Sequence, residues 1–470
     1  MKKEKVMIFW EFSLNTFDVW VFLGVLVVVF LISNTLRRKV KFIRNSLLPT
    51  ALIGGLLMLI LKSFGLFDKL FDVKSMNEFM ESVTYHALGL GVIALSLKAT
   101  PKNKTKESQK QVFNAGLITV NTYLIQAIAG TALTLLMIVT FFKDLFPATG
   151  LLLPLGFGQG SGQSNNFGSM FENTYGFIGG QSFGLSIATI GFLVAGIVGV
   201  AHINIMKRRG RIKDREETTF TTIEEMVSPN EIPVTEAVDR LTIQVALIMF
   251  VYFITFLFMY GIEKLDIGNF GTNTLKPLIW GFNFLIGSLF AVLLKTIFKK
   301  LREKNLMTRD YPNNYLLNRI SGFMFDLMII AGTAAIEIEV MKHLIIPLLI
   351  ITLIGTLITY LYVKKLAYKM FPTYQEEAFV SLFGMLTGTS STGMILLREV
   401  DPKFETPAAN NLIYQSFYAI ALGFPLFLLL GLAPKGLTQT LVSLGIIIGM
   451  FIIFNIILFR EKIFKKKEVK

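Results

Sequence analysis

The sequence predicts an all-α polytopic membrane protein with two inverted five-helix repeats, each containing a re-entrant hairpin, and one extra C-terminal helix. Composition is the first observation: 53% of the 470 residues are hydrophobic, whereas a soluble domain holds roughly 45–50% apolar residues. The second is that long apolar runs alternate with short basic loops. The third is a pair of glycine-rich polar segments that interrupt apolar stretches at matching places in the two halves, a pattern typical of secondary transporters.

The apolar runs come close to the ~20 residues that a helix needs to cross a bilayer. We predict eleven spans, at 17–36, 46–64, 79–97, 112–142, 177–206, 240–260, 275–298, 316–340, 343–367, 407–431 and 437–459. Two shorter polar segments, at about 149–168 and 378–394, are predicted to be re-entrant, because counting them as crossings would upset the charge pattern of the loops.

The basic residues gather in alternate loops, which are those after spans one, three, five and seven and the C-terminal tail. Arg37, Arg38 and Lys39, for example, directly follow the first span. Positive loops stay in the cytoplasm, so we expect a multi-pass protein of the cell membrane with its N-terminus outside and its C-terminus inside. The net charge of +14 therefore reflects membrane topology and gives no reason to expect nucleic acid as a partner.

The order of segments repeats along the chain. Residues 17–206 hold the first repeat, 207–239 a hydrophilic cytoplasmic linker, 240–431 the second repeat, and 437–470 the extra helix and a basic tail. Because each repeat crosses the membrane an odd number of times, the second copy is inserted upside down. We therefore expect the first hairpin to enter from outside and the second from the cytoplasm, so that their tips meet near the midplane.

The tips supply the candidate binding groups. Half-helix N-termini attract anions, and unwound carbonyl groups hold cations such as Na⁺. The alternative is that these small residues only pack helices together or form an ordinary loop. The predicted substrate-binding residues are Gly160, Ser161, Gly162, Gln163, Ser164, Asn165, Gly388, Thr389, Ser390, Ser391 and Thr392.

Asp326 and Thr387 are the sodium candidates. An ionisable side chain deep in a span, as Asp326 is in the eighth, is costly and therefore a functional candidate. A structural pair with Arg319 is the alternative for Asp326. Four further polar side chains are predicted to face the protein interior from spans five and ten: Gln181, Thr189, Asn411 and Gln415.

The stretch GQGSGQSNNFGSMFENTYG, followed by SFGLSIATIGFLVAGIVG, resembles the bacterial sodium/glutamate symporter family. The eighth span, with Asp326, resembles the family's aspartate-bearing helix. The chain departs from the family at Ser161, where a histidine is common, and in the second hairpin, which here reads Gly-Thr-Ser-Ser from Gly388 onward. The matching positions are Gly160, Gly162, Phe171, Tyr175, Gly176, Ala188, Thr189, Gly191, Gly196 and Gly199.

The resemblance implies sodium-coupled import of L-glutamate by alternating access. It also implies a homodimer in which a core domain that contains both hairpins slides against a scaffold, with Na⁺ as the coupling ion and no cofactor. The residues alone leave open a sodium- or proton-coupled transporter of another small carboxylate, and an ion channel. An enzyme is disfavoured, because the chain has no cysteine and shows no HExxH or serine–histidine motif.

Overall fold

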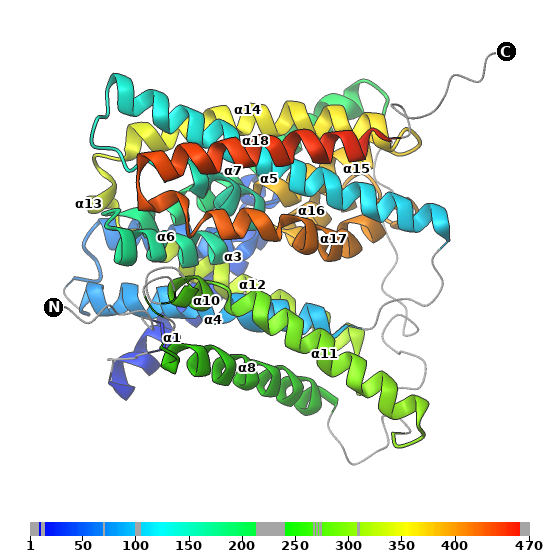
Figure 1. Ribbon diagram of the computed structural model, residues 1–470, viewed down its shortest axis with the longest axis horizontal. Helices are drawn as coiled ribbons and strands as arrows, with labels where there is room; N and C mark the ends of the chain where they lie inside the picture. Colours follow the sequence, from blue (N-terminus) through cyan, green and yellow to red (C-terminus); the bar gives the residue numbers. More distant parts are fainter. Residues whose placement is uncertain are drawn as a thin grey trace.

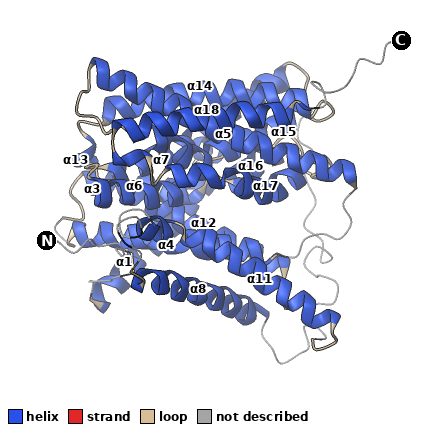
Figure 2. Ribbon diagram, viewed as in Figure 1, coloured by secondary structure: helices blue, strands red, loops and turns tan. Residues whose placement is uncertain are grey.

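The computed structural model describes residues 9–10, 15–68, 71–98, 105–212, 240–266, 268, 271, 275–307 and 311–460. Within those ranges every regular element is a helix, and no strand is present (Figure 2). A helix satisfies its backbone hydrogen bonds internally, which a lipid environment requires of a spanning chain. Most of the predicted linker at 207–239 and the basic end of the segment at 437–470 lie outside the described residues.

The first half of the chain forms long helices with a broken segment before the last of them. Its elements are α1 (Thr16–Lys39), α2 (Lys41–Asn45), α3 (Thr50–Ser63), α4 (Val73–Leu97), α5 (Lys106–Thr140), η1 (Thr149–Leu151), η2 (Pro154–Gly158), α6 (Ser161–Tyr175) and α7 (Gly180–Arg208).

The second half also contains long helices with a broken segment, and it ends in α18. Its elements are α8 (Arg240–Lys264), α10 (Lys276–Gly281), α11 (Asn283–Glu303), α12 (Asn314–Ala334), α13 (Ile338–Met341), α14 (Ile345–Met370), α15 (Gln375–Thr387), α16 (Ser390–Arg398), α17 (Ala408–Leu429), η5 (Ala433–Lys435) and α18 (Leu437–Leu458).

Nine of the eleven predicted spans contain a helix of spanning length, whereas the run at 46–64 contains the shorter α3 and the run at 275–298 is divided between α10 and α11. In the described part of the chain, nine helices are long and apolar enough to cross a membrane, and α3 is a shorter apolar helix. Their outward faces carry exposed apolar side chains such as Leu353 and Ile453, which suit contact with lipid. The protein is therefore a multi-pass, all-α membrane protein.

Two predicted spans are not single continuous helices in the structure. The run at 275–298 breaks at Phe282 into α10 and α11, because the side chain of Asn283 accepts a hydrogen bond from the Phe284 N–H (2.6 Å) and so competes with the helical backbone. The run at 316–340 ends its helix at Ala334, and α13 starts after a short extended stretch at Glu337.

Polar caps fix where several helices begin. Asp72 accepts hydrogen bonds from the Ser75 hydroxyl (2.5 Å) and from the Ser75 N–H (3.2 Å) at the start of α4. These bonds from Ser75 lower the pKa of Asp72 below its usual value. Thr105 and Asn313 cap α5 and α12 in the same way.

The helices pack in two groups, which we call the α4 bundle and the α5 bundle. The α4 bundle contains α1, α3, α4, α8, α11 and α12, in which α4 packs along α12 and α11, and α3 packs on α12. The α5 bundle contains α5, α7, α14 to α18 and the broken segments, and α5 itself packs on α14, α17 and α18. In Figure 1, α8 and α11 lie along one edge of the molecule, and α14 and α18 lie along the opposite edge.

Candidate functional site

The first hairpin turns at Gln159 and Gly160. The π-helical turn η2 ends at Gly158, and α6 begins at Ser161. Gly160 has φ +84° and ψ −172°, a conformation that a residue with a side chain adopts only with strain. The Tyr123 hydroxyl of α5 donates to the Gly158 carbonyl (3.2 Å) and anchors the break. Glycine is therefore required where the sequence places it.

The second hairpin breaks at Gly388 and Thr389, between α15 and α16. The Thr389 hydroxyl accepts a hydrogen bond from the Thr392 N–H (3.5 Å), so Thr389 is the N-cap of α16. Both hairpins thus end their first arm at a break and start a new helix directly after it.

The hairpins enter the molecule from opposite ends of α7. Near the start of α7, the carboxylate of Glu172 accepts hydrogen bonds from the Gly179 N–H (3.3 Å) and the Gln181 N–H (3.0 Å), which ties down the far end of α6. Near the end of α7, His202 Nε2 lies 3.0 Å from Glu376 Oε2 in the first turn of α15. The arms of the two hairpins therefore approach each other from opposite directions.

The two tips are in contact. A Cβ placed on Gly160 would lie 3.2 Å from Thr389 Cγ2 and 3.5 Å from the Gly388 carbonyl oxygen. The N-termini of α6 and α16 therefore lie beside each other. Such helix ends attract a carboxylate or another anion.

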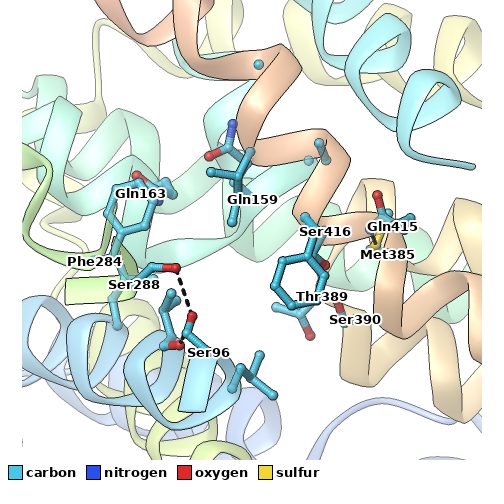
Figure 3. Close-up of a pocket in the computed structure, with 18 of the residues that line it drawn as sticks. Ser96, Gln159, Gln163, Phe284, Ser288, Met385, Thr389, Ser390, Gln415 and Ser416 are labelled. Atoms are coloured by element: carbon cyan, nitrogen blue, oxygen red, sulfur yellow. Dashed lines mark hydrogen bonds between the residues drawn. The ribbon is translucent and has the colours of Figure 1, made fainter. Parts of the chain in front are cut away.

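A cavity of about 250 Å³ adjoins the tips. One wall comes from α4, α11 and α12 of the α4 bundle, and the other comes from both tips and α17 of the α5 bundle (Figure 3). The predicted site residues that line it are Gln163, Gly388, Thr389, Ser390 and Gln415. Residues from both predicted polar segments therefore line one cavity.

Three amide atoms around this cavity are buried without a hydrogen-bond partner in the described structure. Gln159 Nε2 is a hydrogen-bond donor, and Gln163 Oε1 and Gln415 Oε1 are acceptors. Buried polar atoms are normally paired, because an unpaired one costs about 1–3 kcal/mol. The arrangement suits a solute that carries both acceptor and donor groups.

Several predicted residues in the first hairpin do not line the cavity but hold the tip in place. The Ser161 hydroxyl donates to the Met328 carbonyl of α12 (3.3 Å), and the Ser164 hydroxyl donates to the Gly160 carbonyl (3.1 Å). Gly162 lies so close to α4 and α12 that a Cβ would be 2.6 Å from Met328 Sδ. Asn165 donates to the Glu81 carbonyl (3.2 Å).

In the second hairpin, Thr392 Oγ1 lies 3.4 Å from Thr389 Oγ1 and stays buried, whereas Ser391 is exposed and does not line the cavity. The Thr387 hydroxyl donates to the Phe383 carbonyl one turn earlier (2.8 Å).

Asp326 lies half-buried on α12, outside the cavity lining. The described residues contain no ion pair between Asp326 and Arg319, whose guanidinium instead lies over the Tyr315 ring at 5.2 Å. Asp326 interacts electrostatically with Arg37 of α1. The structural pair considered from the sequence is therefore not formed.

Of the four helix-face candidates, Gln415 reaches the cavity and the others pair inside the α5 bundle or at its edge. Gln181 Nε2 donates to Asn165 Oδ1 (2.8 Å), and Thr189 Oγ1 lies 3.3 Å from Thr333 Oγ1 of α12. Asn411 Nδ2 donates to the Tyr374 hydroxyl (2.8 Å) near the start of α15.

The opposite wall contains polar residues that the sequence reading missed. Ser96 Oγ of α4 lies 2.8 Å from Ser288 Oγ of α11, and both residues face the cavity (Figure 3). Lys98, directly after α4, also lines the cavity. Burial lowers the pKa of Lys98, because desolvation disfavours the charged ammonium. Each is a single polar residue in or beside an apolar run. Its place in the cavity wall becomes visible only when the fold brings distant parts of the chain together.

A known protein family matches most of the chain. Residues 15–406 match a family model described as "Sodium/glutamate symporter". No curated protein matches the chain.

Proposed function

The chain belongs to the sodium/glutamate symporter family, and from this premise we propose that glutamate binds in the cavity between the hairpin tips and the α4 bundle. Sodium-coupled glutamate symport is the activity of the family, and the protein is a multi-pass membrane transporter. The observation that carries the proposed site is the set of three unpaired buried amide atoms around one cavity at the meeting point of two helix N-termini.

The polar groups of the cavity suit the α-carboxylate and the ammonium, which all amino acids share. The α-carboxylate is placed at the N–H groups that begin α6 and α16, with Gln159 Nε2 as a further donor. The ammonium is placed between Gln163 Oε1 and Gln415 Oε1, which are acceptors without a partner. Each contact pairs a group that is otherwise buried and unpaired, so binding removes a cost that the free protein carries.

For sodium, we propose Thr387 and the carbonyl groups of the unwound tips as ligands, with Asp326 as a second candidate. Oxygen atoms of hydroxyl and carbonyl groups are the ligands that hold Na⁺ in broken helices. The Thr387 hydroxyl uses its proton toward the Phe383 carbonyl and keeps its lone pairs for a cation. Asp326→Asn tests the second candidate: an unchanged dependence of uptake on sodium concentration would remove Asp326 from the proposal.

We also propose the inverted-repeat architecture and its consequence for movement. The contact of α4 with α11 has a counterpart in the contact of α12 with α3, as exchange of the two repeats requires. Because the cavity lies between the two bundles, sliding the α5 bundle along the α4 bundle would expose it alternately at the two membrane faces. The homodimer and the outside N-terminus belong to the same proposal, which cross-linking in membranes and tag accessibility test.

Uptake of labelled L-glutamate into proteoliposomes tests the function. The purified protein is given an inward sodium gradient and compared with an inward potassium gradient and an inward proton gradient. Accumulation with sodium alone is expected. Accumulation driven by protons alone would overturn sodium coupling, and no accumulation of glutamate under any gradient by correctly inserted protein would overturn glutamate as the solute.

A further inference from the structure

Lys98 is the one charged side chain among the described residues that line the cavity. The remaining lining consists of apolar side chains, hydroxyl groups, amides and glycine backbone. Lys98 lies on the wall that faces the hairpin tips, because it directly follows α4 of the α4 bundle. No carboxylate pairs with it in the part of the chain that the structure describes.

The backbone that carries Lys98 is held by a second lysine. Lys295 of α11 donates from Nζ to the Ser96 carbonyl (3.1 Å) and to the Lys98 carbonyl (2.9 Å), which are free carbonyl groups at the end of α4. Lys98 Nζ donates to Asn318 Oδ1 of α12 (2.6 Å). An ammonium has three N–H donors, and Asn318 is a neutral partner for one of them. The ammonium thus has one neutral partner, at an exposed contact, and no described carboxylate neutralises its charge.

The positive charge of Lys98 has a counterpart in the side-chain carboxylate of glutamate, the solute of the proposed function, and this inference rests on that function. The tips and the three unpaired amides match the α-carboxylate and the ammonium, which acidic and neutral amino acids have in common. A second carboxylate distinguishes glutamate from glutamine, and it needs a positive charge on another part of the cavity wall. We propose that Lys98 pairs with the side-chain carboxylate of the solute and so selects acidic over neutral amino acids.

The test compares four proteins in the proteoliposome assay: wild type, Lys98→Gln, Lys98→Arg and Lys299→Gln. Lys299 is the matched control, because it lies one turn beyond Lys295 on α11, is exposed and does not line the cavity. The measurement is sodium-driven uptake of labelled L-glutamate in competition with unlabelled L-glutamate or unlabelled L-glutamine. The readout is the ratio of the concentrations of the two competitors that halve uptake.

We expect Lys98→Gln to raise the halving concentration of L-glutamate about tenfold and to leave that of L-glutamine within about twofold, since a charge-assisted hydrogen bond is lost only for the acid. Lys98→Arg should keep most of the preference, and Lys299→Gln should behave as wild type. Lys98→Met serves if Lys98→Gln does not fold.

Two results would overturn the inference while leaving symport intact: an unchanged ratio in Lys98→Gln, or an equal change in Lys299→Gln, which would indicate a general effect of surface charge. A wild-type protein that takes up no glutamate would instead overturn the proposed function.

Discussion

Replacing Gln163 by methionine should separate binding from stability. Gln163 is 3% exposed and lines the cavity, and its Oε1 is buried without a partner. Methionine has a similar length and no hydrogen-bonding group to bury. The variant therefore removes an unpaired polar atom that costs the free protein about 1–3 kcal/mol, and the folded protein should be as stable as wild type or more stable.

The same substitution should weaken glutamate binding. A hydrogen bond to a charged group contributes about 1.5–3 kcal/mol, so loss of the contact with the solute ammonium should raise the dissociation constant about 10- to 150-fold. The assays are thermal unfolding of the detergent-solubilised protein and binding of labelled L-glutamate at saturating sodium.

Gln126→Met is the matched control for stability. Gln126 is fully buried and does not line the cavity, and its Nε2 donates to Thr359 Oγ1 (2.9 Å) and to the Leu386 carbonyl (3.1 Å). Gln126 Oε1 is also buried without a partner, but replacement of Gln126 loses both bonds of Nε2 and leaves the Leu386 carbonyl without that donor, so the unfolding temperature should fall. An unfolding temperature as low in Gln163→Met as in Gln126→Met, or wild-type affinity of Gln163→Met for glutamate, would contradict the proposed role of Gln163.

Three further predictions concern the hairpins and their supports. Gly160→Ala should slow sodium-driven uptake, because φ +84° costs a residue with a side chain about 1–3 kcal/mol and the new methyl group would press on Thr389; unchanged uptake kinetics would contradict this. Gly150→Ala should prevent recovery of folded protein, since its Cβ would overlap the Gly130 backbone of α5; a monodisperse chromatography peak would count against it. His202→Leu should destabilise the base of the second hairpin by about 1–3 kcal/mol, because buried Glu376 loses one hydrogen-bond partner; an unfolding temperature equal to that of wild type would be inconsistent with the contact.

The sequence predicts the spans and the broken segments well for a physical reason. Apolar length is a property of a single run, and nine of the eleven predicted spans contain a helix long and apolar enough to cross a membrane. The breaks also have a local signal, because glycine disfavours a helix interior and Gly160 and Gly388 stand among other glycine and small polar residues. The break at Phe282 was not predicted, because it depends on the side chain of Asn283, which looks like an ordinary polar residue in an apolar run.

The sequence alone does not show which residues of the hairpin tips face the cavity. Ser161 and Gln163 are neighbours in sequence, yet α6 directs Ser161 toward the Met328 carbonyl and Gln163 into the cavity. Ser96 and Ser288 are 192 positions apart, and neither run suggests that it meets the other. Which side chains face one cavity depends on helix rotation and packing, which composition and spacing do not encode.

The site proposed between the hairpin tips is tested most directly by protection of a single thiol. The chain has no cysteine, so Ser390→Cys introduces the only reactive thiol at an exposed position that lines the cavity. Ser391→Cys is the matched control, because Ser391 is exposed and does not line the cavity. We predict that sodium with L-glutamate slows maleimide labelling of the Ser390→Cys protein and leaves labelling of the Ser391→Cys protein unchanged. Labelling of the Ser390→Cys protein at the same rate with and without glutamate, or equal slowing in both variants, would contradict the proposed site.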